Sequence, residues 1–122
     1  MIKIRVWYEN KLYVHVEHII YSNGSSAVQL FDENEISFSP DHNKFLATML
    51  WTGLKDKLGQ DIWEGDVVEF YYKGNNVRCE IVFTEGSFSL RWKDGYINKY
   101  QLNASNYIVV GNVYEMIDWR NY

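Results

Sequence analysis

Turn signals recur at short intervals along this chain, and each separates two runs of residues that favour β-strands. Asn23-Gly24 and Asp94-Gly95 are dipeptides typical of tight β-hairpin turns. The runs between turns, such as 67–73 and 77–84, are rich in β-branched and aromatic residues. No long segment shows the periodicity of an amphipathic helix. This spacing predicts an antiparallel meander and therefore an all-β protein.

The segment 40–44 is the clearest candidate for a domain boundary. It contains Pro40, the only proline in the chain, among polar residues. The length of 122 residues suits one domain, or one domain with a small appendage. We therefore expect an N-terminal β region over 1–44 and a second domain over 45–122. Residues 45–50 fit a short helix or a strand equally well, because the run is too short for its periodicity to decide.

Residues 49–70 combine turn chemistry with aromatic anchors. Gly53 ends a β-prone run, and the polar stretch 55–59 ends in a second glycine, as in a tight surface turn. The anchor Trp63 is followed by Glu64-Gly65-Asp66, in which glycine can adopt a positive φ and aspartate can accept backbone hydrogen bonds. The segment predicts a strand, a protruding loop, an anchor, a sharp turn and another strand.

The same segment resembles the signature of the YopX family, in the form T-G-L-K-D-K-x-G-x-x-I-x-E-G-D-V. The signature positions are Thr52, Gly53, Leu54, Lys55, Asp56, Gly59, Glu64, Gly65 and Asp66. Residues 4–7, 11–14, 86–92 and 111–115 are similar to further family motifs in the same order. Leu58 departs from the family pattern, which often has Asn before the turn glycine.

The resemblance implies a small protein encoded by a phage or prophage, with an SH3-like β-barrel at its C-terminal end. It implies no activity, because family members are largely uncharacterised. We expect such a product in the host cytoplasm. A single cysteine, Cys79, excludes a disulfide within the chain and suits a reducing compartment. The start of the chain lacks the apolar region of a signal peptide, and no run is long enough to span a membrane.

Four carboxylates, Asp56, Asp61, Glu64 and Asp66, lie close together in the sequence. A cation site or an acid–base pair would need them to converge on one point. Their positions at turns favour a structural role as caps. Metal-ligand spacings and catalytic or nucleotide-binding motifs are missing. The sequence therefore predicts no enzyme, no catalytic residue, no cofactor and no metal, with Cys79 as a small buried filler.

Aromatic residues are unusually frequent, with five tryptophans, ten tyrosines and six phenylalanines. One interpretation places them in the core and in cross-strand pairs. The other is a contact surface, because Trp and Tyr dominate interface hot spots. The candidate interface residues are Trp51, Trp63, Trp92 and Trp119. We expect a protein-interaction or self-assembling module that forms a homo-oligomer, with the 55–60 loop projecting outward.

The alternative is a nucleic-acid-binding barrel. Its basic patch would consist of Lys55, Lys57, Lys73, Arg78, Arg91 and Lys93. The formal net charge of −4 disfavours this alternative, since nucleic-acid-binding domains are normally basic.

Overall fold

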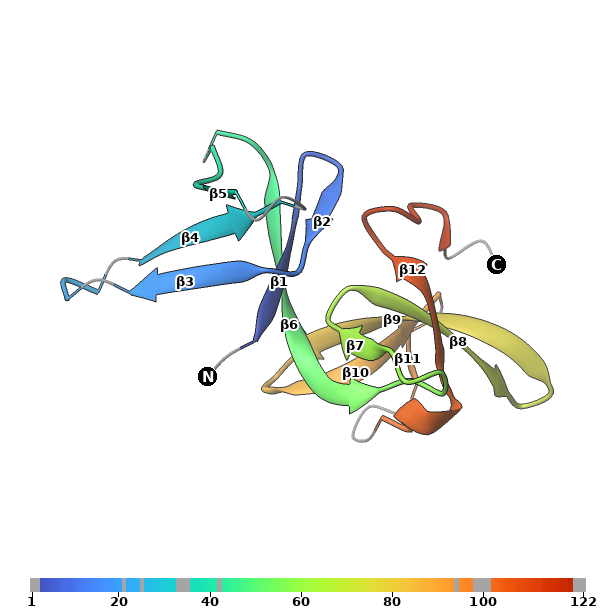
Figure 1. Cartoon of the computed structure of the whole chain (residues 1–122). Helices are drawn as coiled ribbons and strands as arrows, with labels where there is room; N and C mark the ends of the chain where they lie inside the picture. Colours follow the sequence, from blue (N-terminus) through green and yellow to red (C-terminus); the bar gives the residue numbers. More distant parts are fainter. Residues whose placement is uncertain are drawn as a thin grey trace. The chain divides into compact units, whose positions relative to one another are not determined.

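A computed structural model describes residues 3–20, 22–24, 26–32, 36–41, 43–93, 95–97 and 102–119. Strands dominate these residues, which confirms the prediction of a mainly β chain (Figure 1). Contacts divide the chain into two compact units, Met1–Leu50 and Trp51–Tyr122. Each unit is described by itself.

The N-terminal unit contains two small antiparallel sheets. Their strands are β1 (Ile4–Tyr8), β2 (Lys11–Tyr13), β3 (Val16–Ile20), β4 (Ser26–Phe31), β5 (Ser37–Phe38) and the first half of β6 (Leu46–Lys55). One sheet has the order β2–β1–β6 and the other β3–β4–β5. Val6 and Tyr8 of the first sheet pack with Leu30 of the second, and all three are buried. The two sheets therefore share one apolar core.

The C-terminal unit is built on a curled five-stranded antiparallel sheet, in the order β11–β10–β9–β8–β12 (Figure 1). Its elements are β7 (Asp61–Trp63), β8 (Asp66–Tyr72), β9 (Asn75–Thr84), β10 (Ser87–Trp92), β11 (Gly95–Ile97), a 3-10 helix (Ala104–Asn106) and β12 (Ile108–Asn112). The core side chains alternate along the strands, as expected for a sheet with one buried face. Together with two residues from the 3-10 helix and its end, they form the core cluster of Ile62, Val68, Val77, Cys79, Ile81, Leu90, Ala104 and Tyr107. The SH3-like barrel stays a prediction.

The β8–β9 and β9–β10 hairpins turn through two residues with positive φ. These are Lys73 and Gly74 in the first hairpin and Glu85 and Gly86 in the second. Two positive φ angles define the type I′ turn, which matches the twist of paired strands. The predicted turn at 74–76 thus begins one residue earlier, with the asparagines already in β9. Asp94 of the predicted 93–95 turn lies outside the described residues.

Residues 46–50 form a strand, which decides between the two alternatives left open by the sequence. Ala47 and Met49 are buried while Thr48 is exposed, the alternation of a strand with one face on the core. The compact units separate within β6, between Leu50 and Trp51. The domain limits of 1–44 and 45–122 stay a prediction.

Candidate functional site

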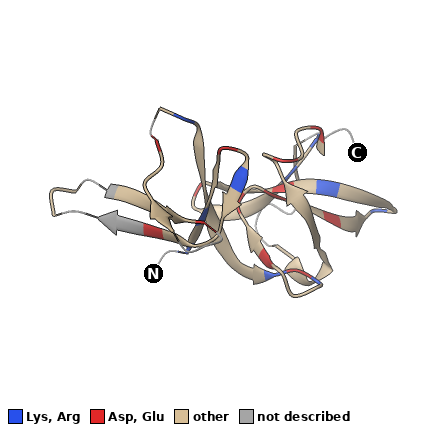
Figure 2. Cartoon of the chain, turned by 45° about the horizontal axis from the view of Figure 1, so that its top comes forward, with Lys and Arg blue, Asp and Glu red and all other residues tan. Residues whose placement is uncertain are grey.

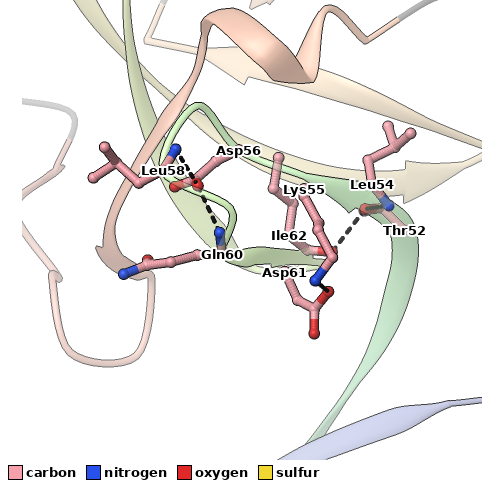
Figure 3. Close-up of polar contacts among 8 residues, drawn as sticks. All are labelled: Thr52, Leu54, Lys55, Asp56, Leu58, Gln60, Asp61 and Ile62. Carbon is pink, nitrogen blue, oxygen red and sulfur yellow. Dashed lines mark hydrogen bonds and ion pairs between the residues drawn. The ribbon is translucent and has the colours of Figure 1, made fainter.

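The first part of the family signature forms the end of β6 and the turn that follows it, and this segment of residues 52–60 is here called the signature loop (Figure 3). Thr52 donates from its hydroxyl to the Ile62 carbonyl at 2.7 Å and accepts from the Leu54 N–H at 3.1 Å. Gly53 between them has a φ of 80°, which allows this tight local contact. Lys55 and Asp61 form an ion pair of 3.1 Å across the base of the loop.

Asp56 is the centre of the signature loop. One carboxylate oxygen accepts from the N–H groups of Leu58 at 2.9 Å and Gln60 at 2.8 Å (Figure 3). The other accepts from the Val109 N–H at the start of β12, at 3.0 Å. Asp56 is only 6% exposed. The prediction that the whole 55–60 loop projects outward is therefore wrong for Asp56, because these hydrogen bonds replace the water that an aspartate would otherwise need.

The remaining residues of the loop tip, 57–60, are exposed as predicted. Gly59 takes the left-handed conformation with a φ of 84°, and its N–H donates to the Asp56 carbonyl at 3.1 Å. Leu58 is not among the described residues with positive φ. The departure from the family's Asn therefore costs no backbone strain.

Hydrogen bonding also shifts the acidity of Asp56. Burial pushes its pKa upward, but the backbone N–H donors of Val109, Gln60, Leu58 and Gly59 outweigh burial and hold the pKa below its usual value. The carboxylate is ionised at neutral pH. It links the loop to a strand 53 residues later in the chain.

The second signature turn, Glu64-Gly65-Asp66, is equally well connected. Gly65 has a φ of 86°, its N–H donates to the Ile81 carbonyl at 2.8 Å, and its carbonyl accepts from Val113 at 2.9 Å. Asp66 is 1% exposed and accepts from the Trp63 N–H at 2.8 Å. Asp56 and Asp66 are therefore turn caps, as predicted. Among the described residues, no three His, Cys, Asp or Glu side chains group as metal ligands would.

A pocket of about 730 Å³ lies beside β8, between that strand and the segment 103–108. We call it the β8 pocket. It is lined by Lys57, Glu69, Phe70, Tyr71, Tyr72, Asn76, Leu90, Asn103, Asn106, Tyr107 and Ile108. Four of the lining residues are aromatic and three carry carboxamides. Apolar walls with a few polar groups are typical of ligand sites.

The signature loop builds one wall of the β8 pocket. The backbone N–H of Lys57 donates to the Tyr107 carbonyl at 2.8 Å, while Asp56 holds Val109 two residues later. The Tyr107 hydroxyl accepts from the Asn103 N–H at 2.9 Å, and its ring lies 4.8 Å from that of Phe70. Loop, 3-10 helix and β8 are thereby fixed around the pocket.

Sequence reasoning missed the β8 pocket. In the sequence, Asn103 and Asn106 look like residues of an ordinary loop, and Tyr107 is one of ten tyrosines. The available signal was the density of Asn beside a β-prone run, which is weak because asparagine is common in loops.

Acidic partners neutralise much of the predicted basic patch. Arg78 binds Glu69 at 3.1 Å and Arg91 approaches Glu80 at 4.0 Å, both across neighbouring strands. Lys55 binds Asp61, as described above. Figure 2 shows basic and acidic residues interspersed along the strands. Within the part of the chain that the structure describes, the Lys57 ammonium has no acidic partner, so it is an uncompensated charge at the β8 pocket.

The candidate interface tryptophans differ in accessibility. Trp63 and Trp119 are each 5% exposed, whereas Trp51 and Trp92 are partly exposed. The surface expected from the sequence is thus reduced to Trp51 and Trp92 in a single chain. Cys79 is fully buried, which confirms its role as a filler, and burial raises the pKa of its thiol to about 12.

Comparison with known proteins gives a consistent picture. The family described as YopX protein matches residues 3–116. The crystal structure of protein yopX from Bacillus subtilis is 22% identical, with 95% of each chain covered and a TM-score of 0.66. A crystal structure of a protein from Enterococcus faecalis is also 22% identical, with 98% of each chain covered and a TM-score of 0.64. At this identity the two structures support the fold alone. No curated protein matches the chain.

The described residues contain no helix that combines the length and apolar character needed to cross a bilayer.

Proposed function

This chain belongs to the YopX family, and on that premise we propose that it is a non-enzymatic protein-interaction module whose binding site is the β8 pocket. The protein would be encoded by a phage or prophage and act in the host cytoplasm. It would need no cofactor, no metal and no membrane. The support for a cytoplasmic site is the single buried thiol, which suits a reducing compartment.

The observation that carries this proposal is the construction of the β8 pocket. The buried Asp56 carboxylate of the signature loop accepts a hydrogen bond from Val109, and the adjacent Lys57 N–H donates to the Tyr107 carbonyl. These two contacts hold one wall of the pocket in place. Catalysis would need a general base in contact with either a nucleophile or a general acid. The pocket instead combines aromatic rings and carboxamides with the Lys57 ammonium. Rings and amides of this kind serve recognition.

Self-association is part of the proposal. Large apolar side chains are exposed on the C-terminal unit, among them Tyr71 at 71% and Ile117 at 81%. Exposed apolar side chains are commonly covered by a partner chain, and identical chains usually close into symmetric oligomers. We expect a homo-oligomer that also binds a phage or host protein.

Nucleic-acid binding is the second candidate, supported by cations that lie over aromatic rings. The Lys73 ammonium lies 5.3 Å from the Tyr72 ring centroid, and that of Lys93 lies 5.4 Å from the Trp92 ring centroid. The ion pairs of the other basic residues weaken this candidate. Fluorescence anisotropy with a labelled single strand of DNA tests it, because phosphate contacts would give a steep dependence on salt.

Photocrosslinking tests the proposed function directly. A benzophenone amino acid is placed at Asn106, which lines the β8 pocket, and separately at Glu85, an exposed hairpin residue outside it. We expect a defined protein adduct from Asn106 in phage-carrying host cells, and its loss in Lys57→Glu. Equal adducts from both positions, or none from either, would contradict the proposal.

A further inference from the structure

The β8 pocket lies beside the part of β8 that β12 no longer pairs with. Strand β12 pairs with β8 only as far as Ile108 opposite Glu69. Before Ile108 the chain runs as Tyr107 and a 3-10 helix, whose backbone bonds are local: Asn106 and Tyr107 donate to Asn103 and Ala104. Residues 70–72 of β8 are therefore an edge on this side, within the described part of the chain. The same residues line the pocket.

The hairpin register identifies which backbone groups point to this edge. Tyr72 and Asn75 flank a two-residue turn, so they form a closely hydrogen-bonded pair between β8 and β9. Phe70 has the same orientation, because hydrogen-bonding direction alternates along a strand. Tyr71, between them, must direct its N–H and C=O away from β9. Neither group has a partner among the described residues.

We propose that the β8 pocket binds an extended peptide segment of a partner protein, which adds a strand to the edge of β8 through the backbone of Tyr71. This inference rests on the proposed interaction function and names its mode. A backbone N–H and C=O that point outward from a strand edge are matched by the same pair on another extended chain. Small ligands seldom present both groups at strand spacing.

The charge of the pocket defines the chemistry of the segment. Two charged residues line it: Glu69, whose carboxylate is bound by Arg78, and Lys57, which has no described acidic partner. An acidic side chain or a terminal carboxylate of the peptide would complement Lys57. The side-chain amides of Asn76 and Asn106, which have no partner among the described residues, can bond further peptide groups, and Tyr72 and Phe70 offer apolar contact. The occupant is thus an acidic, extended peptide.

The experiment begins with a library of eight-residue peptides sorted against the 122-residue chain. One selected peptide is then synthesised with N-methyl groups at alternate residues, in each of the two possible phases. Strand addition directs every second peptide N–H toward β8. We therefore expect at least about a tenfold loss of affinity in one phase and little change in the other. Equal losses in both phases, or none, would overturn the inference.

Protein variants localise the contact. Tyr71→Pro removes the outward N–H without touching the bonds to β9, since proline is tolerated where a strand edge faces solvent. We expect it to weaken binding at least about tenfold, whereas Tyr71→Val, which keeps the N–H, should retain most of the affinity. Lys57→Met should weaken binding about tenfold and reduce its salt dependence, while Lys55→Met, a loop lysine outside the pocket, should not.

The outcomes separate this inference from the function on which it rests. Peptide binding that survives Tyr71→Pro overturns strand addition and leaves the interaction function in place. If no peptide is selected but a partner is crosslinked at Asn106, strand addition is likewise overturned and the interaction function stays. The partner would then bind through a folded surface. If a second copy of the chain displaces the peptide from the β8 pocket, the occupant is another copy of this chain, and the proposal of a segment from a different protein is overturned. Should Tyr71→Pro not fold, the N-methyl series on the wild-type chain still decides.

Discussion

Asp56 connects two segments that are far apart in the sequence, because each of its carboxylate oxygens accepts backbone hydrogen bonds from a different one. In Asp56→Asn an amide NH2 must face an N–H donor on one side. We expect a loss of about 1–3 kcal/mol in the free energy of unfolding by urea. Asp61→Asn is the matched control, since it weakens an ion pair with the exposed Lys55 and leaves the backbone donors around Asp56 untouched, so it should cost less than about 1 kcal/mol. Equal losses would remove Asp56 from its central role.

The lowered pKa of Asp56 adds a dependence on pH. A carboxyl group with a pKa lower in the folded than in the unfolded state stabilises the fold above the unfolded value, about 4, and loses that effect as pH falls through the folded value. The stability gap between wild type and Asp56→Asn should therefore narrow steadily in acid. Urea midpoints measured from pH 7 downward test this. A gap independent of pH would contradict the assignment.

Gly65 adopts a φ of 86° inside a buried, hydrogen-bonded turn. A β-branched side chain disfavours that angle, so Gly65→Val should destabilise the protein by roughly 1–3 kcal/mol in thermal or urea unfolding. Gly74→Val is the control for the backbone angle alone, because Gly74 has a positive φ in an exposed turn where nothing lies within 4 Å of an added Cβ. An unchanged midpoint in Gly65→Val would mean that this turn contributes nothing to stability.

At the scale of the element, the turn between β8 and β9 has a residue poorly suited to its backbone conformation, and a substitution can correct this. Lys73 occupies the first central position of a type I′ turn with a φ of 48°, where asparagine before glycine is preferred. We expect Lys73→Asn to stabilise the protein by roughly 0.5–1 kcal/mol. Lys73→Ala is the control, since it removes the ammonium above the Tyr72 ring without easing the backbone. If both variants stabilise equally, the turn conformation is not the reason.

Local signals and distant contacts explain what the sequence could and could not predict. Turn dipeptides such as Asn23-Gly24 and the Gly65 turn act within a few residues, so the hairpins and the β class were predictable. The strand at 46–50 depends on pairing with β1, which a short apolar run does not encode. The β8 pocket depends on the contact between Asp56 and Val109. The local sequence pattern around either residue does not indicate that the two are in contact.

At the scale of the whole molecule, charge and apolar surface favour the proposed protein partners over nucleic acid. The net charge is −4, and Arg78 and Arg91 face acidic neighbours across the sheet. These two arginines are therefore less available to displace counterions from a nucleic acid. The exposed apolar residues are distributed over both units, from Phe45 at 70% to Ile117 at 81%. Surface of this kind gains more from a protein contact than from water.

Self-association is the prediction that decides how this surface is used. We expect sedimentation velocity at micromolar concentration to give a mass above the 14.5 kDa of one chain. At least one tryptophan should lie at the subunit contact, and Trp51 and Trp92 are the candidates because Trp63 and Trp119 are buried within the chain. Either Trp51→Ser or Trp92→Ser should then shift the chain toward the monomer, and a retained thermal unfolding transition would show that the variant is folded. A wild-type monomer at every concentration would contradict self-assembly. The partly exposed tryptophans would then mark the surface on which a different protein docks, since Trp is enriched where partners bind.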